Sequence, residues 1–489
     1  MSGVLNFLAV VVGAFAANLL LPVLVSATAD DGHVGNFLLL AALLLFLAGS
    51  LYLALQGRSI RIGRVGSYGL LLLSWVCLSV AGALPFALVG NFPVIDALFE
   101  SVSGLTTTGS TILEDPGTLP VSLRLWRSQL QWLGGFLTLL SIILVLAPAG
   151  VGGLPDQHIK HIEHAGRGGG DFRITRSILS IAAAYGIATL LCFIALVLTR
   201  IPLIDAACLT FSTVSTGGFQ PHAGTLGVHK NPAAELVITV FMIVGATSLL
   251  WQRMILQRRW HQIAAHRESY FLIAAALVVG LSYGIAGIVQ ADLGTGHVGD
   301  ALRKLQAGLL TGASLVTTTG FQSADIPFGA LPVAAVLVAA FIGGGTFSTA
   351  GGIKMYRLGG MVVQSIRELG RLVYPHGIRP AHFGSQPYDM QLMKSIWSFS
   401  FVAGLVVMLG TAFFAVAIPD FEGALMAAIA NFSNIGPLYG PGWSDGGDWP
   451  HYGAFSGFSK SVAMALMLLG RIEILALFGA LNLSYWLNR

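Results

Sequence analysis

The chain has 489 residues, of which 55% are hydrophobic and 10% are charged, and its formal net charge is +4 at pH 7. Soluble proteins carry about 25% charged residues, so this composition excludes a soluble globular protein and favours one embedded in a bilayer. The three cysteines, Cys77, Cys192 and Cys208, are far apart in apolar surroundings, which indicates core residues and not a disulfide framework or a metal site.

Two apolar segments at the start of the chain, residues 5–25 and 37–55, are expected to cross the membrane. Each has about the 20 residues that a helix needs to span a hydrocarbon core of about 30 Å. An acidic turn at Asp30 and Asp31 joins them. We expect these two helices to stand outside the repeat that occupies the rest of the chain.

That repeat occurs four times: a long apolar helix, a helix too short to span, a hydroxyl-rich strip ending in glycine, and a second long apolar helix. The strips end at Gly109, Gly218, Gly320 and Gly436, which are 109, 102 and 116 residues apart. One strip alone could be an ordinary loop between helices, because Thr and Gly are common there. Four copies in one register favour a four-fold site.

The helices of the repeats can be placed from the sequence. The outer helices are predicted at residues 68–89, from 178, at 271–289 and at 396–417, and the inner helices at 125–146, at 234–250, from 331 and at 458–483. Pro93 with Asp96, and Pro202 with Asp205, open the first two short helices, because proline and acidic residues are favourable at a helix start. The third short helix covers 302–315, and the fourth follows Pro419.

This arrangement is typical of a pore. Glycine permits the backbone dihedrals that let successive carbonyls face one axis, and rings of carbonyls can replace the water shell of a cation. The short helices would aim the negative ends of their dipoles at the same axis. The third inner helix is interrupted by glycines at 343–345 and at 351–352. A packing kink is one interpretation of this break, and a gate below the pore loops is the other.

The basic residues indicate the orientation. The segment before the first repeat and the linkers between repeats hold Arg58, Arg61, Arg64, Lys160, Arg167, Arg173, Arg176, Arg253, Arg258, Arg259, Arg267, Lys354, Arg357, Arg367, Arg371, Arg379 and Lys394. The loops within repeats carry mainly acidic residues, namely Glu114, Asp115, Asp292, Asp325, Asp445 and Asp448. The positive-inside rule therefore predicts cytoplasmic linkers, external pore loops and two cytoplasmic termini.

Several strings in the chain resemble the potassium-translocating subunits of the Trk, Ktr and HKT superfamily, and the two leading helices resemble its Trk branch. The strings include Arg127-Ser128 with Gln131-Trp132-Leu133-Gly134-Gly135, Ser348-Thr349-Ala350-Gly351-Gly352-Ile353-Lys354, Asn434-Ile435-Gly436-Pro437 and Met467-Leu468-Leu469-Gly470-Arg471-Ile472-Glu473. The resemblance covers essentially the whole chain. It implies an all-α integral membrane protein with four pseudo-symmetric pore repeats.

The resemblance implies a potassium filter made by the four glycines and the three residues before each. These are Thr106, Thr107, Thr108, Gly109, Ser215, Thr216, Gly217, Gly218, Thr317, Thr318, Thr319, Gly320, Ser433, Asn434, Ile435 and Gly436. In related plant transporters a serine at the first filter glycine goes with sodium transport, so Gly109 favours potassium. Potassium would be the transported substrate, and no organic cofactor is expected.

The resemblance also implies a gate in the broken third inner helix. Its residues would be Gly343, Gly344, Gly345, Gly351, Gly352, Lys354 and Arg471. Thr346 and Phe347 are bulkier than the small residues usual in this loop. From the sequence alone, Lys354 is expected to be an ordinary cytoplasmic boundary residue, and Arg471 can equally form a salt bridge with Glu473. A buried cation costs at least about 2.5 kcal/mol, so Arg471 requires a partner or a function.

We therefore predict potassium uptake across the bacterial inner membrane, with no nucleic-acid partner. The resemblance also implies a homodimer and a cytosolic nucleotide-binding regulatory subunit (TrkA-like). The predicted units are residues 1–66, 67–150, 151–252, 253–365 and 366–489. The first alternative is a secondary transporter of sodium or a small solute, which predicts inverted halves. The second is a membrane-embedded enzyme, which needs ionisable residues that converge within the spans, and the spans hold few.

Overall fold

The computed structural model describes residues 2–57, 64–146, 170–224, 231–290, 298–374, 382–383, 386–388, 390–440, 443 and 449–474. Some predictions lie outside the described residues: the boundary at 150/151, the inner helix beyond 474, and the basic or acidic residues Arg58, Arg61, Lys160, Arg167, Asp292, Arg379, Asp445 and Asp448. Within the described part, seven helices are long and apolar enough to cross a membrane, and one bent pair could form an eighth span. The chain is therefore a multi-span membrane protein of the all-α class.

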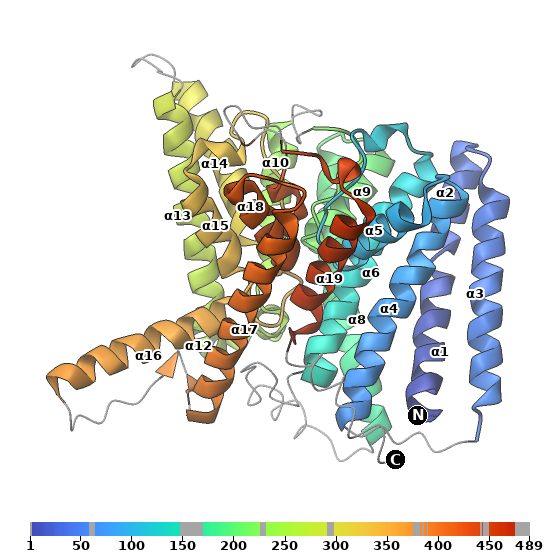
Figure 1. Ribbon diagram of the computed structural model, residues 1–489, viewed down its shortest axis with the longest axis horizontal. Coiled ribbons are helices and arrows are strands. Elements are labelled where there is room, and N and C mark those ends of the chain that lie inside the picture. Colours follow the sequence, from blue (N-terminus) through green and yellow to red (C-terminus); the bar gives the residue numbers. More distant parts are fainter. Residues whose placement is uncertain are drawn as a thin grey trace.

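The leading helices pack at one edge of the molecule. The first span consists of α1 (Ser2–Ala17) and α2 (Leu20–Ala29), and α3 (Val34–Ala54) runs back beside it. Figure 1 shows them in blue at the right, outside the helices that follow. Their contacts with the body include the edge-to-face pair of Phe15 and Trp126, whose ring centroids are 5.6 Å apart. The two extra helices predicted from the sequence are confirmed.

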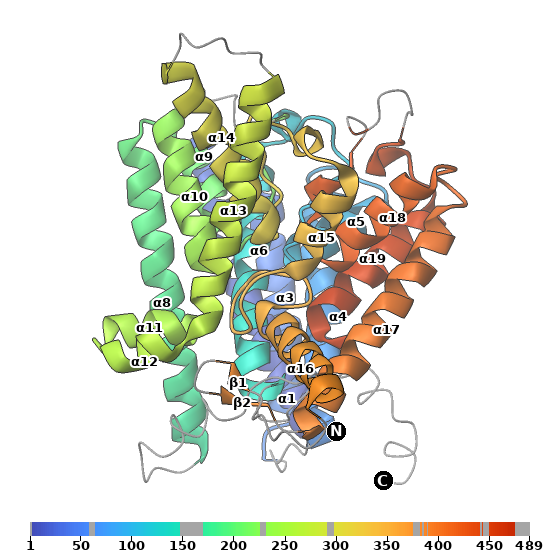
Figure 2. The ribbon, with the colours of Figure 1, turned by 90° about the vertical axis from the view of Figure 1, so that its left-hand side faces the viewer.

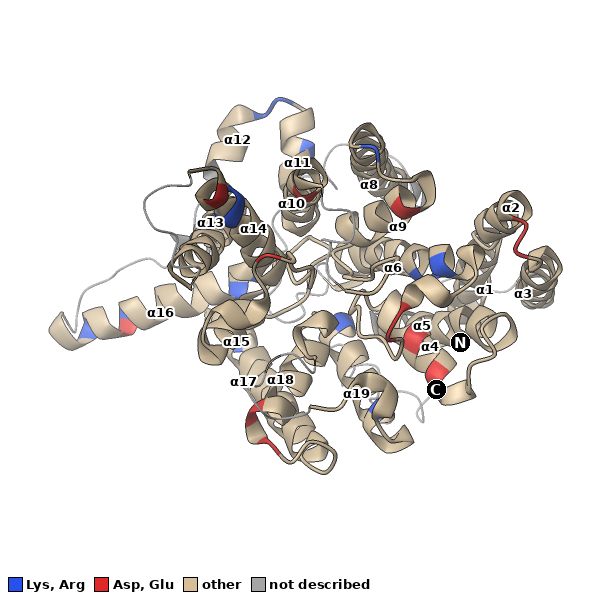
Figure 3. Cartoon of the chain, turned by 90° about the horizontal axis from the view of Figure 1, so that it is seen from above, with Lys and Arg blue, Asp and Glu red and all other residues tan. Residues whose placement is uncertain are grey.

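The remaining helices form four groups around a centre. In chain order they are α4 (Arg64–Leu88), α5 (Val94–Leu105) and α6 (Val121–Ser141); α8 (Gly170–Leu198), α9 (Leu203–Val214) and α10 (Pro232–Ala246); α13 (Arg267–Gln290), α14 (Val298–Val316) and α15 (Val333–Ile342); and α17 (Met390–Phe414), α18 (Phe421–Phe432) and α19 (Gly457–Ile472). Each group contains an outer helix, a short helix and an inner helix. Figure 3, seen from above, shows the groups around central loops drawn mostly in tan, with few charged residues.

Three of the short helices start where the sequence predicts, whereas the third, α14, has 19 residues and starts at Val298 instead of the predicted residue 302. Pro93 precedes α5 and Pro202 precedes α9, with Asp96 and Asp205 in the respective first turns. Asp420 caps α18 by accepting the backbone N–H of Gly423 at 3.0 Å. The helices α5, α9 and α18 have 12 residues each and extend about 18 Å, too short for a hydrocarbon core of about 30 Å.

Two inner helices are broken, and the fourth, predicted for 458–483, ends at Ile472 before the left-handed Glu473 (φ 68°). After α10 the chain turns by 103° into α11 (Leu249–Leu256), so the single inner helix predicted for 234–250 is interrupted at Thr247 and Ser248. After α15 a non-helical loop leads to α16 (Met355–Val373), which projects from the lower part of the molecule in Figure 1. Figure 2 shows α11, α12 (Trp260–Ala265) and α16 at this same end.

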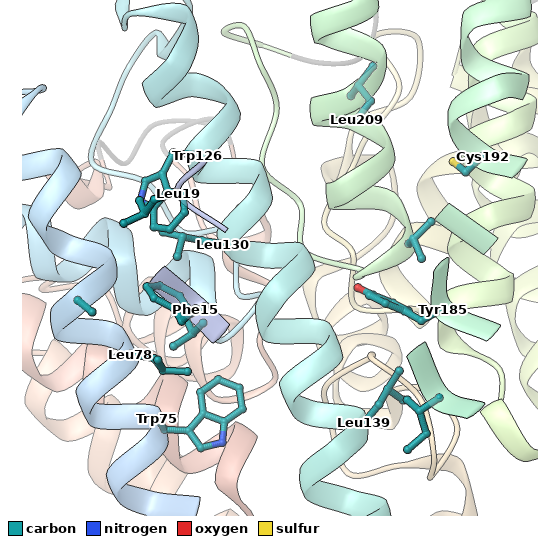
Figure 4. Close-up of a cluster of buried hydrophobic side chains, with 14 of the residues drawn as sticks. Phe15, Leu19, Trp75, Leu78, Trp126, Leu130, Leu139, Tyr185, Cys192 and Leu209 are labelled. Carbon is teal, nitrogen blue, oxygen red and sulfur yellow. The ribbon is translucent and has the colours of Figure 1, made fainter. Parts of the chain in front are cut away.

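Short elements complete the described chain: η1 (Pro116–Thr118), η5 (Phe328–Ala330), η6 (Gly436–Leu438) and η7 (Tyr452–Ala454) are single 3-10 turns, and η2 (Ile142–Leu146) is a π-helical end to α6. A two-residue antiparallel pair, β1 (His382–Phe383) and β2 (Gln386–Pro387), follows α16. The largest apolar core joins the leading helices to the first two groups, through residues such as Trp75, Leu130 and Tyr185 in Figure 4.

Candidate functional site: a ring of four loops above a buried loop

The short helices α5, α9, α14 and α18 all end in the same turn. The second residue after each helix has a left-handed backbone: Thr107 (φ 53°), Thr216 (φ 54°), Thr318 (φ 57°) and Asn434 (φ 55°). These residues are not glycines, and three are β-branched, so the conformation costs roughly 1–2 kcal/mol each unless the surroundings impose it. The predicted four-fold repeat in the sequence is therefore a four-fold repeat in the backbone.

The hydrogen bonds of this turn are also repeated. In the first strip, Thr107 N–H donates to the carbonyl of Gly104 at 3.0 Å and Thr108 N–H to that of Ser103 at 2.9 Å. The same two hydrogen bonds, to the carbonyls three and five residues earlier, recur in the other strips. Their lengths are 3.1 and 2.7 Å in the second strip, 3.2 and 2.9 Å in the third, and 3.4 and 2.8 Å in the fourth. This is the Schellman pattern, which caps carbonyls at the end of a helix and turns the chain sharply.

The strips then meet one another in a closed ring. A side chain on Gly109 would clash with the carbonyl of Gly217, one on Gly218 with the carbonyl of Thr319, one on Gly320 with Pro437, and one on Gly436 with Ser110. Gly109, Gly218 and Gly320 also have φ between 81° and 86°, which favours glycine. The structure thus brings the four strips together and explains why each ends in glycine.

The fourth strip differs from the others. Gly436 begins a 3-10 turn and donates its N–H to the carbonyl of Thr108 at 2.6 Å. A Cβ on any of the other three strip glycines would point at the ring of Pro437, so this ring packs closely against all three. The Asn434 amide donates to the hydroxyl of Thr108 at 2.9 Å and to the carbonyl of Met467 at 3.0 Å. The first and fourth strips are therefore joined directly by hydrogen bonds.

A buried ion pair supports the first strip from outside. The guanidinium of Arg127 lies 3.1 Å from the carboxylate of Glu100, and both side chains are at most 1% exposed. Glu100 also accepts from the hydroxyl of Thr111 at 2.6 Å and from the N–H of Ile112 at 2.8 Å. Glu100 is thus a structural carboxylate that is held by an ion pair and two hydrogen bonds.

The loop between α15 and α16 lies directly under the ring. Gly351 N–H donates to the hydroxyl of Thr318 at 2.7 Å, and the hydroxyl of Thr349 lies 3.3 Å from that of Thr216. Gly351 also packs so closely on the Ser433 carbonyl that a Cβ would clash with it. The second, third and fourth strips therefore contact this loop. The second and third do so through their left-handed residues, and the fourth through the residue before its left-handed one.

The same loop fills the break in the second inner helix. Gly345 N–H donates to the carbonyl of Ala246 at 2.8 Å, and Leu249 N–H donates to that of Phe347 at 2.8 Å. Thr346 donates its N–H and its hydroxyl to the carboxylate of Glu268, both at 2.7 Å. Phe347 is only 1% exposed. The two bulky residues noted in the sequence therefore anchor the loop to its neighbours.

Two cations predicted for the gate are buried here. Lys354 is 6% exposed and donates to the carbonyl of Ala350 inside the loop, so the interpretation as a cytoplasmic boundary residue is wrong. Arg471 is 5% exposed and donates to the hydroxyl of Thr107 in the first strip. The carboxylate of Glu473 forms its salt bridge with Arg357, at 2.7 Å, and not with Arg471. The structure thus brings Arg471 to the lower side of the ring.

Sequence reasoning missed two features of the site. The first is the break after Ala246, for which the only local signal is the polar pair Thr247-Ser248 in an apolar run. The second is Gln131, which was noted only as part of a string and contacts the second strip directly. No cluster of His, Cys, Asp or Glu that could hold a metal ion occurs among residues that the structure describes.

Comparisons with known proteins agree with this architecture. The sequence model of the TrkH family, described as "Cation transport protein", matches residues 35–481. The chain is 27% identical over 492 residues to the Trk system potassium uptake protein TrkH of Halomonas elongata, covering 99% of this chain and 98% of that protein. It is 30% identical over 426 residues to the Trk system potassium uptake protein TrkI of the same organism, covering 85% and 82%.

The fold comparison covers almost the whole chain. The crystal structure of the potassium transporter TrkH from Vibrio parahaemolyticus superposes with a TM-score of 0.85 at 26% identity, covering 99% of both chains. Because the family match extends over most of the sequence and the fold agrees from the leading helices to the fourth repeat, the chain belongs to the TrkH family of cation transport proteins.

Proposed function

We propose that this protein takes up potassium ions across the bacterial inner membrane, through a filter built by the four strips. The observation that carries the proposal is the ring at Gly109, Gly218, Gly320 and Gly436, with the same left-handed turn before each glycine. Carbonyls of the three residues before each glycine would replace water around the ion. The similarity to proteins named for potassium uptake supports this choice of substrate.

The loop from Gly343 to Gly352 is proposed as the gate, with Lys354 and Arg471. Its hydrogen bonds to Thr216 and Thr318 support this role, because a segment in that place obstructs the path below the ring. Backbone without helical hydrogen bonds at membrane depth must be buried in protein or face a cavity. The buried charges would add an electrostatic barrier to cations.

Orientation and assembly complete the proposal. Basic linkers on the cytoplasmic side imply that both termini are cytoplasmic and that the ring is reached from outside. A homodimer and a cytosolic nucleotide-binding regulatory subunit are proposed partners, and potassium is the transported substrate. The five predicted units, from residues 1–66 to 366–489, stay a prediction of the repeat boundaries.

Uptake of rubidium and sodium into proteoliposomes that contain the purified protein tests the filter. We expect the wild type to take up rubidium far better than sodium, and Gly109→Ser to erode the difference, because the added side chain meets the Gly217 carbonyl. Equal selectivity in both proteins, with robust rubidium uptake, would remove Gly109 from the filter. No selectivity in the wild type would overturn the potassium assignment itself.

A further inference from the structure

One face of α6 lies against the filter strips. Arg127, Gln131 and Gly134 share this face, because residues four and seven positions apart stack along a helix. A Cβ on Gly134 would clash with the carbonyl of Leu105, at the end of the first short helix. The glycine therefore lets α6 approach the ring closely enough for side chains one and two turns earlier to reach the neighbouring strip.

Gln131 binds the second strip with both ends of its amide. Its Nε2 donates to the carbonyl of Gly217 at 2.6 Å, and its Oε1 accepts the N–H of Phe219 at 3.2 Å. The side chain is fully buried. It also packs flat on Gly217, where any Cβ would clash with the Gln131 amide. The direction of the Gly217 carbonyl is therefore fixed by a side chain from another repeat.

Arg127 holds the same strip one turn away. Its guanidinium lies 4.0 Å from the ring centre of Phe219, and it donates to the carbonyl of Gln220 at 3.4 Å. Because Glu100 neutralises this guanidinium, the arginine can stay buried beside the strip. The backbone is thus held at Gly217, Phe219 and Gln220 by one helix face.

We propose that Gln131 is a positioning residue for ion selectivity: it sets the direction of the Gly217 carbonyl, and so the discrimination between potassium and sodium. The inference rests on the proposed filter. One way for a filter to reject the smaller ion is to keep its carbonyls from following that ion inward. A carbonyl held by a buried amide resists this movement, whereas the same carbonyl without the amide can turn towards sodium.

The test compares Gln131→Met with Gln129→Met in the proteoliposome assay. Methionine keeps the length and the packing of glutamine but forms neither hydrogen bond. Gln129 is a matched control, because it lies on the same helix, is 2% exposed and donates to the carbonyl of Asn18, away from the strips. We expect the ratio of rubidium to sodium uptake to fall severalfold in Gln131→Met and to stay at the wild-type value in Gln129→Met.

A second variant tests the hydrogen bond itself and decides the question if Gln131→Met does not fold. In Gln131→Glu, a protonated carboxyl group can donate to Gly217 and accept from Phe219, whereas the ionised carboxylate cannot donate. The uptake ratio of this variant should therefore fall as pH rises, and that of Gln129→Glu should not. An unchanged ratio in folded Gln131→Met, an equal loss in Gln129→Met, or a flat pH profile in Gln131→Glu would each overturn the inference. Loss of selectivity in the wild type would instead count against the filter.

Discussion

Replacing Glu100 by glutamine should destabilise the protein strongly, because it leaves a buried guanidinium without its counter-charge. The two side chains of the Glu100–Arg127 pair are 0% and 1% exposed. Removing one partner of such a pair costs about 3–5 kcal/mol of unfolding free energy, since the remaining charge stays desolvated. Glutamine keeps one acceptor for Thr111 and Ile112, so the lost charge dominates the effect.

Unfolding in mixed detergent micelles, followed by tryptophan fluorescence, measures this loss. Glu368→Gln is the control, because Glu368 and its partner Arg371 are 48% and 50% exposed and such pairs contribute less than about 1 kcal/mol. Removing both charges, in Glu100→Gln with Arg127→Met, should cost less than Glu100→Gln alone. If Glu100→Gln were no more destabilising than Glu368→Gln, the pair would not be the support that its burial indicates.

Two further predictions concern charged groups elsewhere. Arg471→Gln should raise rubidium uptake about tenfold, because it removes the positive charge that opposes cations below the ring. A decrease of about 1.4 kcal/mol in that barrier corresponds to a tenfold change. Unchanged uptake would show that Arg471 does not contribute to the barrier. Burial raises the pKa of Asp31, but hydrogen bonds from Ser122 and Ser26 outweigh it and hold the pKa below its ordinary value. The stabilisation is therefore present above pH about 3.9 and lost as pH falls through the lowered pKa, so Asp31→Asn should be destabilising at pH 7 and lose its effect in acid, as measured by thermal unfolding.

The repeated parts of the fold could be predicted because their signals are local. Pro93 and Pro202 precede short helices, and each strip ends in a glycine, which the close approach of the strips and, in three of them, a positive φ require. The break between α10 and α11 could not be predicted, because its hydrogen bonds come from Gly345 and Phe347 in another repeat. An apolar run carries no information about a partner so distant in the sequence.

The partners of the buried charges were predicted poorly for the same reason. Arg471 and Glu473 are close in the sequence, yet Glu473 binds Arg357, which is 116 residues away, and Arg471 donates to Thr107. Lys354 lies at the end of a glycine-rich loop, where the sequence allows a boundary residue, but the loop folds back under the ring and buries it. The pairing of these buried side chains depends on how the repeats pack against one another, and the sequence pattern of one repeat carries no information about that packing.

The four strips share one backbone turn although the side chains that support them differ. Glu100 and Thr311 each lie nine residues before a strip glycine, and each accepts a backbone N–H from 12 residues further on, that of Ile112 or Ser323. A charged carboxylate in the first repeat and a neutral hydroxyl in the third therefore accept the equivalent backbone hydrogen bond. The second strip relies on Gln131 instead. In the proposed filter the ion is held by backbone carbonyls, so all four strips need the same backbone, whereas each repeat can hold that backbone with different side chains.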